Sequence, residues 1–586
     1  MVQLYCGKGI VQMEIDFHHI KPNVTRLSTL AQRLAVHSGV TEPVDLQSII
    51  QHGVDEGQLH IFPVGSGKDR RIFVSNECVS PKNMKTRPRL IRKEGKEHRR
   101  RSVVPGGQIM GDRLSPTYLR AVDYMSSMRF RPNTAILQLM DELEKEKFFD
   151  PIRNTMELLM MSEFRTYGTG SYSLPVFPDY RTRLYTDSGG IASYQGGDWH
   201  RATCDFAVSK PANSEAIHYA LKLLASEYNV TEDNYRQILA AGKEAIKNPG
   251  DFGINKKPAC SYRAALAIEE LHETGQSAYI LQQDQHASGP DLLAKMTGCE
   301  TLASIVRDGR FWKEAVSYVK NGNLLPEICQ NFDIFQTTTA AKDVITPMLY
   351  TAGNATQMKG IILSRPTTDL VQFMDRTGCY IPGSLDKHTK DDLNPDYAHI
   401  WKSMGWERAV RVASDVARAY EKAVFALIPT LRKLMTNIKK VAKVAEDEGR
   451  YLTWENVSGC KIINRKIEEN TLADMCMISI TYNGKRYRSS YYPMHEVGSS
   501  SAALPNLVHS QDGGVLHLTV CWCAEREVWI ATIHDSLGTH VADAPMLWSV
   551  FLDNLELVGP ETNDTLMVEN GLPKLGFSRL ASRTKD

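Results

Sequence analysis

The stretch "ATIHDSLGTH", residues 531–540, decides how the rest of the chain is interpreted. Apolar residues flank a polar tip made of His534, Asp535 and Ser536, and this pattern predicts a β-hairpin with these three residues at its turn. A rigid turn fixes the direction of a carboxylate, and carboxylate oxygens are ligands that Mg²⁺ prefers. Asp535 is therefore a candidate metal ligand, and a second carboxylate is needed elsewhere in the chain.

The segment "YILQQDQHASGPDLLAKMTG", residues 279–298, supplies that second acid. A short apolar strand over residues 278–281 is expected to lead into Asp284, and a helix is expected from near Pro290. A strand followed by an acid and a helix start places the carboxylate at a sheet edge. The backbone carbonyl of Gln285 lies beside it as a further hard oxygen ligand. Asp284 and Asp535 are informative as a pair only if further motifs accompany them.

Two further motifs lie between these acids. In "TTTAAKDVITPMLYTAGNATQMKG", residues 337–360, Lys342 and Tyr350 are eight positions apart, so on a helix their directions differ by about 80° and both can face one cleft. Pro347 is expected to distort that helix. In "LPNLVHSQDGGVLHLTV", residues 504–520, His509 is expected just before a helix that starts near Asp512.

These motifs, in this order, resemble those of the single-subunit DNA-directed RNA polymerases of bacteriophages and mitochondria. "DQHASG" resembles the first acidic motif of that family, and the Lys342 and Tyr350 pair resembles its fingers helix. "PNLVHSQDG" and "IHDSLGTHVADA" resemble its most characteristic pair of motifs. "FPDYRTRLYTDS", residues 177–188, resembles a template-contacting segment. The ordered match runs from about residue 130 to residue 586.

The resemblance implies a two-metal nucleotidyl transfer. Asp284 and Asp535, with the carbonyl of Gln285, would hold two Mg²⁺ ions, one activating the 3′-hydroxyl and one bridging the triphosphate. Lys342 would neutralise the incoming phosphates. Tyr350 would close the nucleotide pocket.

The resemblance also implies roles in binding. His509 would sense the ribose together with the tyrosine, Arg181 and Arg183 would hold template phosphates, and His534 would support the hairpin and the end of the transcript. The implied partners are a DNA template with its promoter, the RNA transcript and ribonucleoside triphosphates. Related DNA polymerases carry a glutamate where this chain has Gly289, and the smaller residue leaves room for a 2′-hydroxyl, which favours RNA synthesis.

The fold implied is an α+β right hand with palm, fingers and thumb, mostly helical around an antiparallel palm sheet. A second hairpin is predicted at residues 477–492 by its Asn483-Gly484 turn. Its Arg486 and Arg488 share one strand face and would suit contacts in a nucleic-acid groove. The alternative is an ordinary solvent-exposed hairpin. The expected divisions are a reduced N-terminal domain (1–115), N-terminal helices with a short thumb (116–175), a first palm part (176–335), fingers with the hairpin (336–500) and a second palm part (501–586).

Several positions depart from the family pattern. Thr338 stands where an arginine usually precedes the fingers lysine, Thr351 follows Tyr350 in place of a glycine, and Thr182 separates the two arginines in place of a glycine. The last change puts the backbone path at that turn in question. The chain is also shorter than phage members, mainly before residue 180, so we expect it to depend on a helper protein or on opened DNA.

Composition sets outer limits. At 586 residues several subdomains are expected, and the net charge of +1 means that nucleic acid must be met by local basic surfaces. The basic stretch 85–102 is such a surface or a solvated loop, and "GSGKD", residues 65–69, lacks the earlier glycine of a phosphate loop and is expected to be a turn. No run of 18 apolar residues and no signal pattern occur, which favours the cytoplasm, that of a bacterial host if phage-encoded, and no membrane association.

Two other classes of function stay open. One is a related template-directed DNA polymerase, and the other is a catalytically silent nucleic-acid-binding relative. The presence of both Asp284 and Asp535 argues against the silent relative. A metal hydrolase is poorly supported because the sequence has no histidine-rich ligand cluster.

Overall fold

The computed structural model of the chain describes most of its residues. Those described are 2–6, 9–13, 24–38, 43–64, 71–75, 114–150, 154–179, 181–186, 192–254, 257–285, 287–349, 397, 399–400, 406–469, 474–498, 500–571 and 573–577. The basic stretch 85–102, the "GSGKD" segment, Tyr350 and Thr351 lie outside the described residues.

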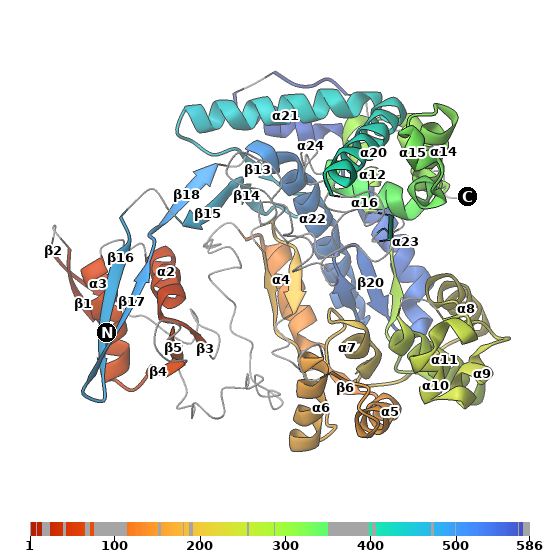
Figure 1. The fold of residues 1–586 in the computed structure, drawn as a ribbon, viewed down its shortest axis with the longest axis horizontal. Coiled ribbons are helices and arrows are strands. Elements are labelled where there is room, and N and C mark those ends of the chain that lie inside the picture. Colours follow the sequence, from red (N-terminus) through yellow and green to blue (C-terminus); the bar gives the residue numbers. More distant parts are fainter. Residues whose placement is uncertain are drawn as a thin grey trace.

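The N-terminal residues form a small unit with its own core (Figure 1). Its helices are α2 (Leu27–Ser38) and α3 (Pro43–Asp55). These helices share a core with an antiparallel sheet in the strand order β3-β5-β4, and β1 and β2 form a separate two-stranded sheet. The strands are β1 (Val2–Cys6), β2 (Gly9–Met13), β3 (Val24–Arg26), β4 (His60–Val64) and β5 (Arg71–Ser75).

A hairpin from far along the chain completes this small core. Strands β16 (Cys476–Tyr482) and β17 (Lys485–Tyr491) pair antiparallel beside α2 and α3 (Figure 1). Their turn has positive φ at both Asn483 (50°) and Gly484 (71°), as a two-residue type I′ turn requires, so the predicted hairpin is confirmed. Its buried face, with Ile478, Ile480 and Tyr487, packs on the apolar residues of α2 and α3.

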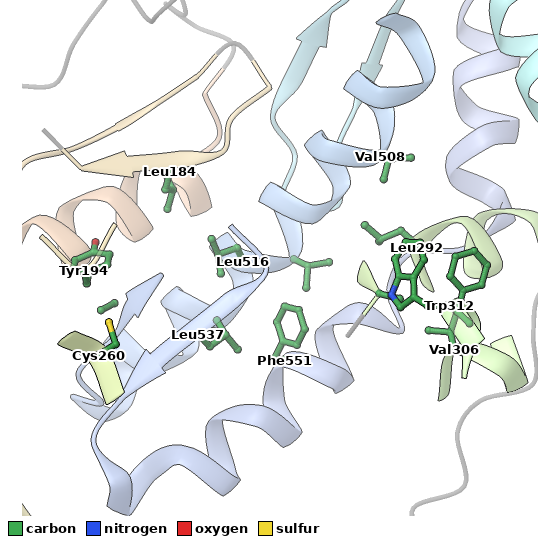
Figure 2. Packing of buried hydrophobic residues seen from close by; sticks show 14 of the residues in the cluster. Leu184, Tyr194, Cys260, Leu292, Val306, Trp312, Val508, Leu516, Leu537 and Phe551 are labelled. Carbon is green, nitrogen blue, oxygen red and sulfur yellow. The ribbon is translucent and has the colours of Figure 1, made fainter. Parts of the chain in front are cut away.

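A second and larger core holds the rest of the described chain. Helix α22 (Ala503–Arg526) is buried around most of its circumference and contacts α4, α12, α21 and α23. Figure 2 shows Leu516 of α22, Leu537 of β20 and Phe551 of α23 gathered at its centre. The surrounding helices are α4 (Pro116–Ser127), α5 (Thr134–Lys145), α6 (Thr155–Tyr167), α7 (Asp198–Thr203), α8 (Ser214–Tyr228), α9 (Tyr235–Ala241), α10 (Lys243–Lys247), α11 (Pro258–Thr274), α12 (Ser288–Thr297), α23 (Ala544–Leu555) and α24 (Pro560–Glu569).

A group of helices between the two acidic motifs packs against this core. The helices are α13 (Glu300–Arg307), α14 (Phe311–Asn321), α15 (Glu327–Gln330), α16 (Thr338–Leu349), α20 (Trp406–Leu427) and α21 (Pro429–Asp447). Pro429 ends α20 and begins α21, as its missing amide hydrogen and fixed φ dictate. Helix α16 continues past Pro347 to Leu349, so this proline does not end it at that position. Short 3₁₀ turns complete the list: η4 (Pro249–Phe252), η5 (Asp333–Gln336), η7 (Ser500–Ala502) and η8 (Val541–Asp543).

Small antiparallel sheets are set among these helices, which supports the α+β class. The three-stranded sheet β12-β20-β19 is central, and the other sheets pair β6 with β9, β7 with β8, β10 with β11, β13 with β14 and β15 with β18. The strands are β6 (Phe130–Pro132), β7 (Val176–Pro178), β8 (Leu184–Thr186), β9 (Cys204–Phe206), β10 (Lys210–Pro211), β11 (Gln276–Ser277), β12 (Leu281–Gln283), β13 (Thr453–Glu455), β14 (Lys461–Ile463), β15 (Arg465–Glu469), β18 (Met494–Gly498), β19 (Ala531–Ile533) and β20 (Ser536–Thr539). Among the described helices, none combines the length and the apolar character that crossing a bilayer requires.

Candidate active site

The central sheet brings the two predicted acids to one edge. Strand β12 pairs antiparallel with β20, with Gln283 opposite Leu537, and β20 pairs with β19, with Ile533 opposite Ser536. Asp284 directly follows β12, and Asp535 lies in the turn that joins β19 to β20. The end of one strand and the turn of its neighbour therefore meet at the same edge, as the sequence predicted.

The turn that carries Asp535 is tighter than the sequence indicated. Ser536 is the first residue of β20 rather than part of the turn, so the connection is only His534 and Asp535, and His534 has a left-handed φ of 56°. The Ser536 hydroxyl donates to Gln282 Oε1 at 3.0 Å and joins the hairpin to β12. A Cβ on Gly538 would lie 2.5 Å from Gln282 Nε2 and 2.7 Å from the Ala531 oxygen, so this strand position requires glycine. These constraints fix the edge that holds the acids.

The charges at this edge oppose one another. The Asp284 side chain reaches solvent, yet the protein around it removes part of its hydration, and together with the charge of Asp535 this raises the pKa of Asp284 to about 7. Lys257 and Lys342 act in the other direction. Two carboxylates that repel each other at an open edge form an arrangement that a divalent cation stabilises, because the cation removes the repulsion.

The residues at the edge fit magnesium better than a metal with an all-protein ligand shell. Within the described chain no group of three or more His, Cys, Asp or Glu side chains comes together as a metal-binding cluster. Mg²⁺ is commonly held by one or two carboxylates, with water and substrate phosphates completing the shell, so the pair Asp284 and Asp535 is a sufficient protein contribution. The Gln285 side chain is engaged elsewhere, since its Nε2 donates to Asp291 Oδ2 at 2.7 Å.

Arg181 reaches from the loop between β7 and β8 to helix α22. Its Nε donates to Asp179 Oδ2 at 2.8 Å, and its Nη1 lies 2.9 Å from His509 Nδ1. An arginine can only donate, so His509 Nδ1 accepts and the imidazole proton is on Nε2. Burial, followed by the charges of Arg183 and Arg181, holds the pKa of His509 far below its usual range. His509 is therefore a neutral side chain in a fixed tautomer.

Arg183 forms the second link between this loop and α22. Its Nη2 donates to Asp512 Oδ2 at 2.7 Å, and the two side chains are 12% and 4% exposed. Burial raises the pKa of Asp512 to about 6 against the opposing charge of Arg183, and Asp535 acts in the same direction as burial. Both predicted template-binding arginines are thus committed to protein carboxylates, Asp179 and Asp512, neither of which was singled out from the sequence.

Helix α22 is continuous through the motif that joins it to the arginines. The predicted helix start near Asp512 is wrong, because α22 begins at Ala503 and contains both His509 and Asp512. The two adjacent glycines inside this helix serve close packing. A Cβ on Gly513 would lie 3.2 Å from the Thr182 oxygen, and one on Gly514 would lie 2.9 Å from Val457 Cγ2.

Thr182 adopts the left-handed backbone conformation that a glycine would adopt easily. Its φ is 69°, and its side chain is buried. Asn456 Nδ2 donates to the Thr182 hydroxyl at 3.1 Å, and His517 Nε2 donates to the Thr182 carbonyl at 2.8 Å. These two bonds hold the unusual turn, so the backbone path between Arg181 and Arg183 is kept without the glycine.

The turn of the β13–β14 hairpin supports α22 and the arginine loop together. Asn456, in this turn, also donates from Nδ2 to the Ser510 carbonyl at 3.0 Å, and the Trp454 indole donates to the Ser510 hydroxyl at 2.9 Å. The Val457 amide donates to Gln511 Oε1 at 3.0 Å. Nothing in the sequence pattern indicated this hairpin as part of the site, because its contacts join segments more than fifty residues apart.

The remaining predicted residues take the following places. The ring of His534 lies edge to face with Tyr185, 5.1 Å between centroids, and burial lowers the pKa of His534. Lys342 is exposed on α16 with its Nζ 5.8 Å from the centroid of the Trp312 ring, and its charge acts on Asp284. Gly289 is buried in α12, and Tyr350 falls outside the described residues.

Comparison with known proteins gives a consistent result. The family model for DNA-dependent RNA polymerase matches residues 395–555. The DNA-directed RNA polymerase of Pseudomonas phage phiKMV is 22% identical over 400 residues, 63% of this chain and 45% of the relative. A probable DNA-directed RNA polymerase of Agaricus bitorquis is 21% identical over 557 residues, 81% of this chain and 49% of the relative. The chain spans about half the length of these relatives, and its resemblance to the single-subunit RNA polymerases is confirmed.

Proposed function

We propose that this chain, a relative of the single-subunit DNA-directed RNA polymerases, transfers nucleotides from ribonucleoside triphosphates onto a growing RNA in transcription of phage genes. The observation that carries the proposal is the meeting of Asp284 and Asp535 at one edge of the central sheet. The acids are separated by about 250 residues in the chain, and only this fold brings them together. The names of the relatives support the same activity.

The chain's own residues would prepare the reaction as follows. Asp284, Asp535 and the carbonyl of Gln285 would hold two Mg²⁺ ions, which when bound activate the 3′-hydroxyl and stabilise the pyrophosphate leaving group. Lys342 would lie over the triphosphate and offset its charge, since its own charge already acts on Asp284. Tyr350 would close the nucleotide pocket.

His509 would read the sugar of the incoming nucleotide. Its Nδ1 accepts from Arg181, which places the ring proton on Nε2, and this Nε2–H would donate to a ribose hydroxyl. Arg181 and Arg183 would bind template phosphates. Because each already pairs with a carboxylate, part of this binding would come from the positive charge of the loop and not from direct contacts. His534 would hold the hairpin turn against Tyr185 at the end of the transcript.

The architecture proposed is a right hand. The β12-β20-β19 sheet would be the palm, helices α16, α20 and α21 would lie in the fingers, and α5 with α6 would form a short thumb. The β16–β17 hairpin would read promoter DNA through Arg486 and Arg488, which are exposed on the face opposite the small N-terminal core. The enzyme would work in the bacterial cytoplasm and require a helper protein or opened DNA.

The alternative function is that of a related DNA polymerase, and Gly289 argues against it. Gly289 stands where those enzymes carry a glutamate, and it lies at the start of α12, five residues after Asp284. A glycine there leaves space for the 2′-hydroxyl of a ribonucleotide. The choice between the two polymerases therefore depends on the nucleotide that the enzyme incorporates.

Primer extension on a template that is already open tests the proposal. An RNA primer annealed within an unpaired region should be extended with ribonucleotides and Mg²⁺, and much less with deoxyribonucleotides. Asp535→Asn should abolish extension, whereas Asp233→Asn, an exposed acid remote in sequence from the motifs, should leave it intact. Extension by the Asp535 variant at the parental rate would refute the assignment.

A further inference from the structure

A groove on the helical part of the chain lies apart from the paired acids. It has a volume of about 490 Å³ and forms where the end of α14 meets the junction of α20 and α21 (Figure 1). Tyr318 and Leu324 line it from the α14 side, and Phe425 and Pro429 line it from the other side. Pro429 shapes the groove, because the break that it causes turns α21 away from the axis of α20.

The groove combines aromatic surface with positive charge. The Tyr318 side chain is 43% exposed, which is high for a large aromatic residue. Lys422 and Arg432 also line the groove, and the residues that form its wall include no acid. The guanidinium of Arg432 lies 4.4 Å from the centroid of the Phe425 ring, so this cation is held over an aromatic face.

A basic stripe leads along α20 to the groove. Exposed positions follow one another at helical spacing and carry cations at Arg408, Arg411, Arg418 and Lys422. One acid, Asp415, interrupts them, and its Oδ1 lies 3.3 Å from Arg418 Nη1. From Arg408 to Lys422 the stripe is about 21 Å long. This concentration of cations contrasts with a chain whose net charge is only +1.

We propose that the α20 stripe and the groove bind single-stranded DNA, with phosphates along the stripe and a base against Tyr318. This inference rests on the proposed function and names a second contact for its DNA. Cations that follow a backbone and exposed aromatic rings that accept bases are the two elements of single-strand binding without sequence preference. The opposite face of α20 packs on α16, which carries Lys342. Only helix α16 therefore lies between DNA bound to α20 and the proposed catalytic centre.

The chemistry of the groove selects DNA as the ligand. Recognition of RNA over DNA requires hydrogen-bonding groups placed for the 2′-hydroxyl. The only side-chain hydroxyl among the lining residues is that of Tyr318, and no amide or carboxylate accompanies it. A surface of this composition gains nothing from a ribose, and the proposed function supplies an unpaired DNA strand whose bases and phosphates it can bind.

Binding of a labelled oligothymidylate of about 20 nucleotides tests the proposal. The full chain is first saturated with an unlabelled RNA primer on its template, so that the proposed catalytic cleft is occupied. Fluorescence anisotropy then measures the affinity of the oligothymidylate between about 50 and 200 mM salt. Tyr318→Ala should weaken binding about 5- to 100-fold through lost stacking, and Tyr318→Phe should restore it.

The double variant Arg411→Ala with Lys422→Ala tests the stripe. It should lower the salt slope by about 1.4, because two phosphate contacts are lost. A matched double variant, Arg236→Ala with Lys222→Ala, removes two exposed cations elsewhere and should leave the slope unchanged. A bromodeoxyuridine oligonucleotide should cross-link to the peptide that contains Tyr318.

The outcomes separate this inference from the proposed function. Unchanged binding in the Tyr318→Ala and stripe variants overturns the groove proposal, as does tighter binding of oligouridylate or of duplex DNA than of oligothymidylate. Asp535→Asn should lose extension and keep oligothymidylate binding. A parental chain that binds oligothymidylate through Tyr318 but makes no RNA refutes the polymerase assignment and leaves the groove proposal standing.

Discussion

Arg183 and Asp512 form an ion pair with 2.7 Å between Nη2 and Oδ2, and it joins the β7–β8 loop to α22 beside the turn of Asp535. Both side chains are withdrawn from water, and Asp535 adds a second negative charge nearby. The pair therefore fixes the distance between two segments that carry predicted site residues. Its contribution is to position the edge of the site.

Removal of one partner from this pair should be costly. In Asp512→Ala the guanidinium of Arg183 stays buried without its carboxylate, and loss of one member of a buried pair destabilises proteins by about 3–5 kcal/mol. Urea unfolding followed by tryptophan fluorescence measures the change. The control is Glu525→Ala, which breaks an exposed pair with Arg120 at 3.0 Å and should cost less than about 1 kcal/mol. Equal costs for the two variants would contradict the structural role.

Thr182 offers a test of a strained turn. In Thr182→Ala the left-handed φ remains and the hydroxyl that accepts from Asn456 is lost, so the strained backbone is kept and Asn456 Nδ2 loses one of its acceptors. In Thr182→Gly the same bond is lost, but the backbone conformation is relaxed. We expect the glycine variant to be more stable than the alanine variant by about 1 kcal/mol, measured by thermal and urea unfolding. An alanine variant that matches or exceeds the glycine variant would show that the turn stores no strain.

Asn456 should prove more important than its place in a short hairpin suggests. Asn456→Ala leaves the Thr182 hydroxyl and the Ser510 carbonyl without this donor and should destabilise the chain by about 1–3 kcal/mol. In primer extension the KM for the nucleotide should rise by a larger factor than kcat falls, because the segments that carry Arg181 and His509 lose their support. Asn437→Ala, on the half-buried surface of α21, is the control for loss of an amide and should change neither quantity appreciably.

The stability of the chain should fall in mild acid because of His517. This histidine is buried, with Nε2 donating to Thr182 and Nδ1 accepting from the Ser458 hydroxyl, and burial lowers its pKa from 6.5 to about 4. The unfolded chain binds the proton more readily than the folded chain, so stability decreases as pH falls from about 6.5 to about 4. Urea unfolding at pH 7 and pH 5 should show a smaller difference in His517→Gln than in the parent. An identical pH dependence in both proteins would assign the effect to other groups.

Local patterns in the sequence were sufficient for some parts of the site and not for others. The hairpins at Asp535 and at Asn483-Gly484 follow from turn chemistry, which acts within a few residues. The meeting of Asp284 with Asp535 was predicted through the family resemblance, because spacing along the chain does not determine which strands pair.

The contacts that could not be predicted join distant segments. Asn456 bonds to Thr182, 274 residues away, and no periodicity in either segment indicates the other. The start of α22 was predicted too late in the chain, near Asp512, and the role of its paired glycines depends on which distant segments lie against them. The pair of Arg183 with Asp512 was missed for the same reason, whereas Asp179, the partner of Arg181, lies only two residues away in the same motif.

The β16–β17 hairpin should separate promoter recognition from catalysis. Arg486 and Arg488 are exposed, while Tyr487 between them is buried in the small N-terminal core, so the arginines can be changed without disturbing that core. The double variant Arg486→Ala with Arg488→Ala should reduce initiation at a promoter by at least about tenfold, since each good base contact is worth about 1–3 kcal/mol. Extension of a primer on an open template should stay within about twofold of the parent, because the hairpin has no part in the chemistry at Asp284 and Asp535. Lys222→Ala provides a single-charge control on an exposed face of α8. A proportionate loss in both assays would mean that the arginines hold nucleic acid generally and do not read the promoter.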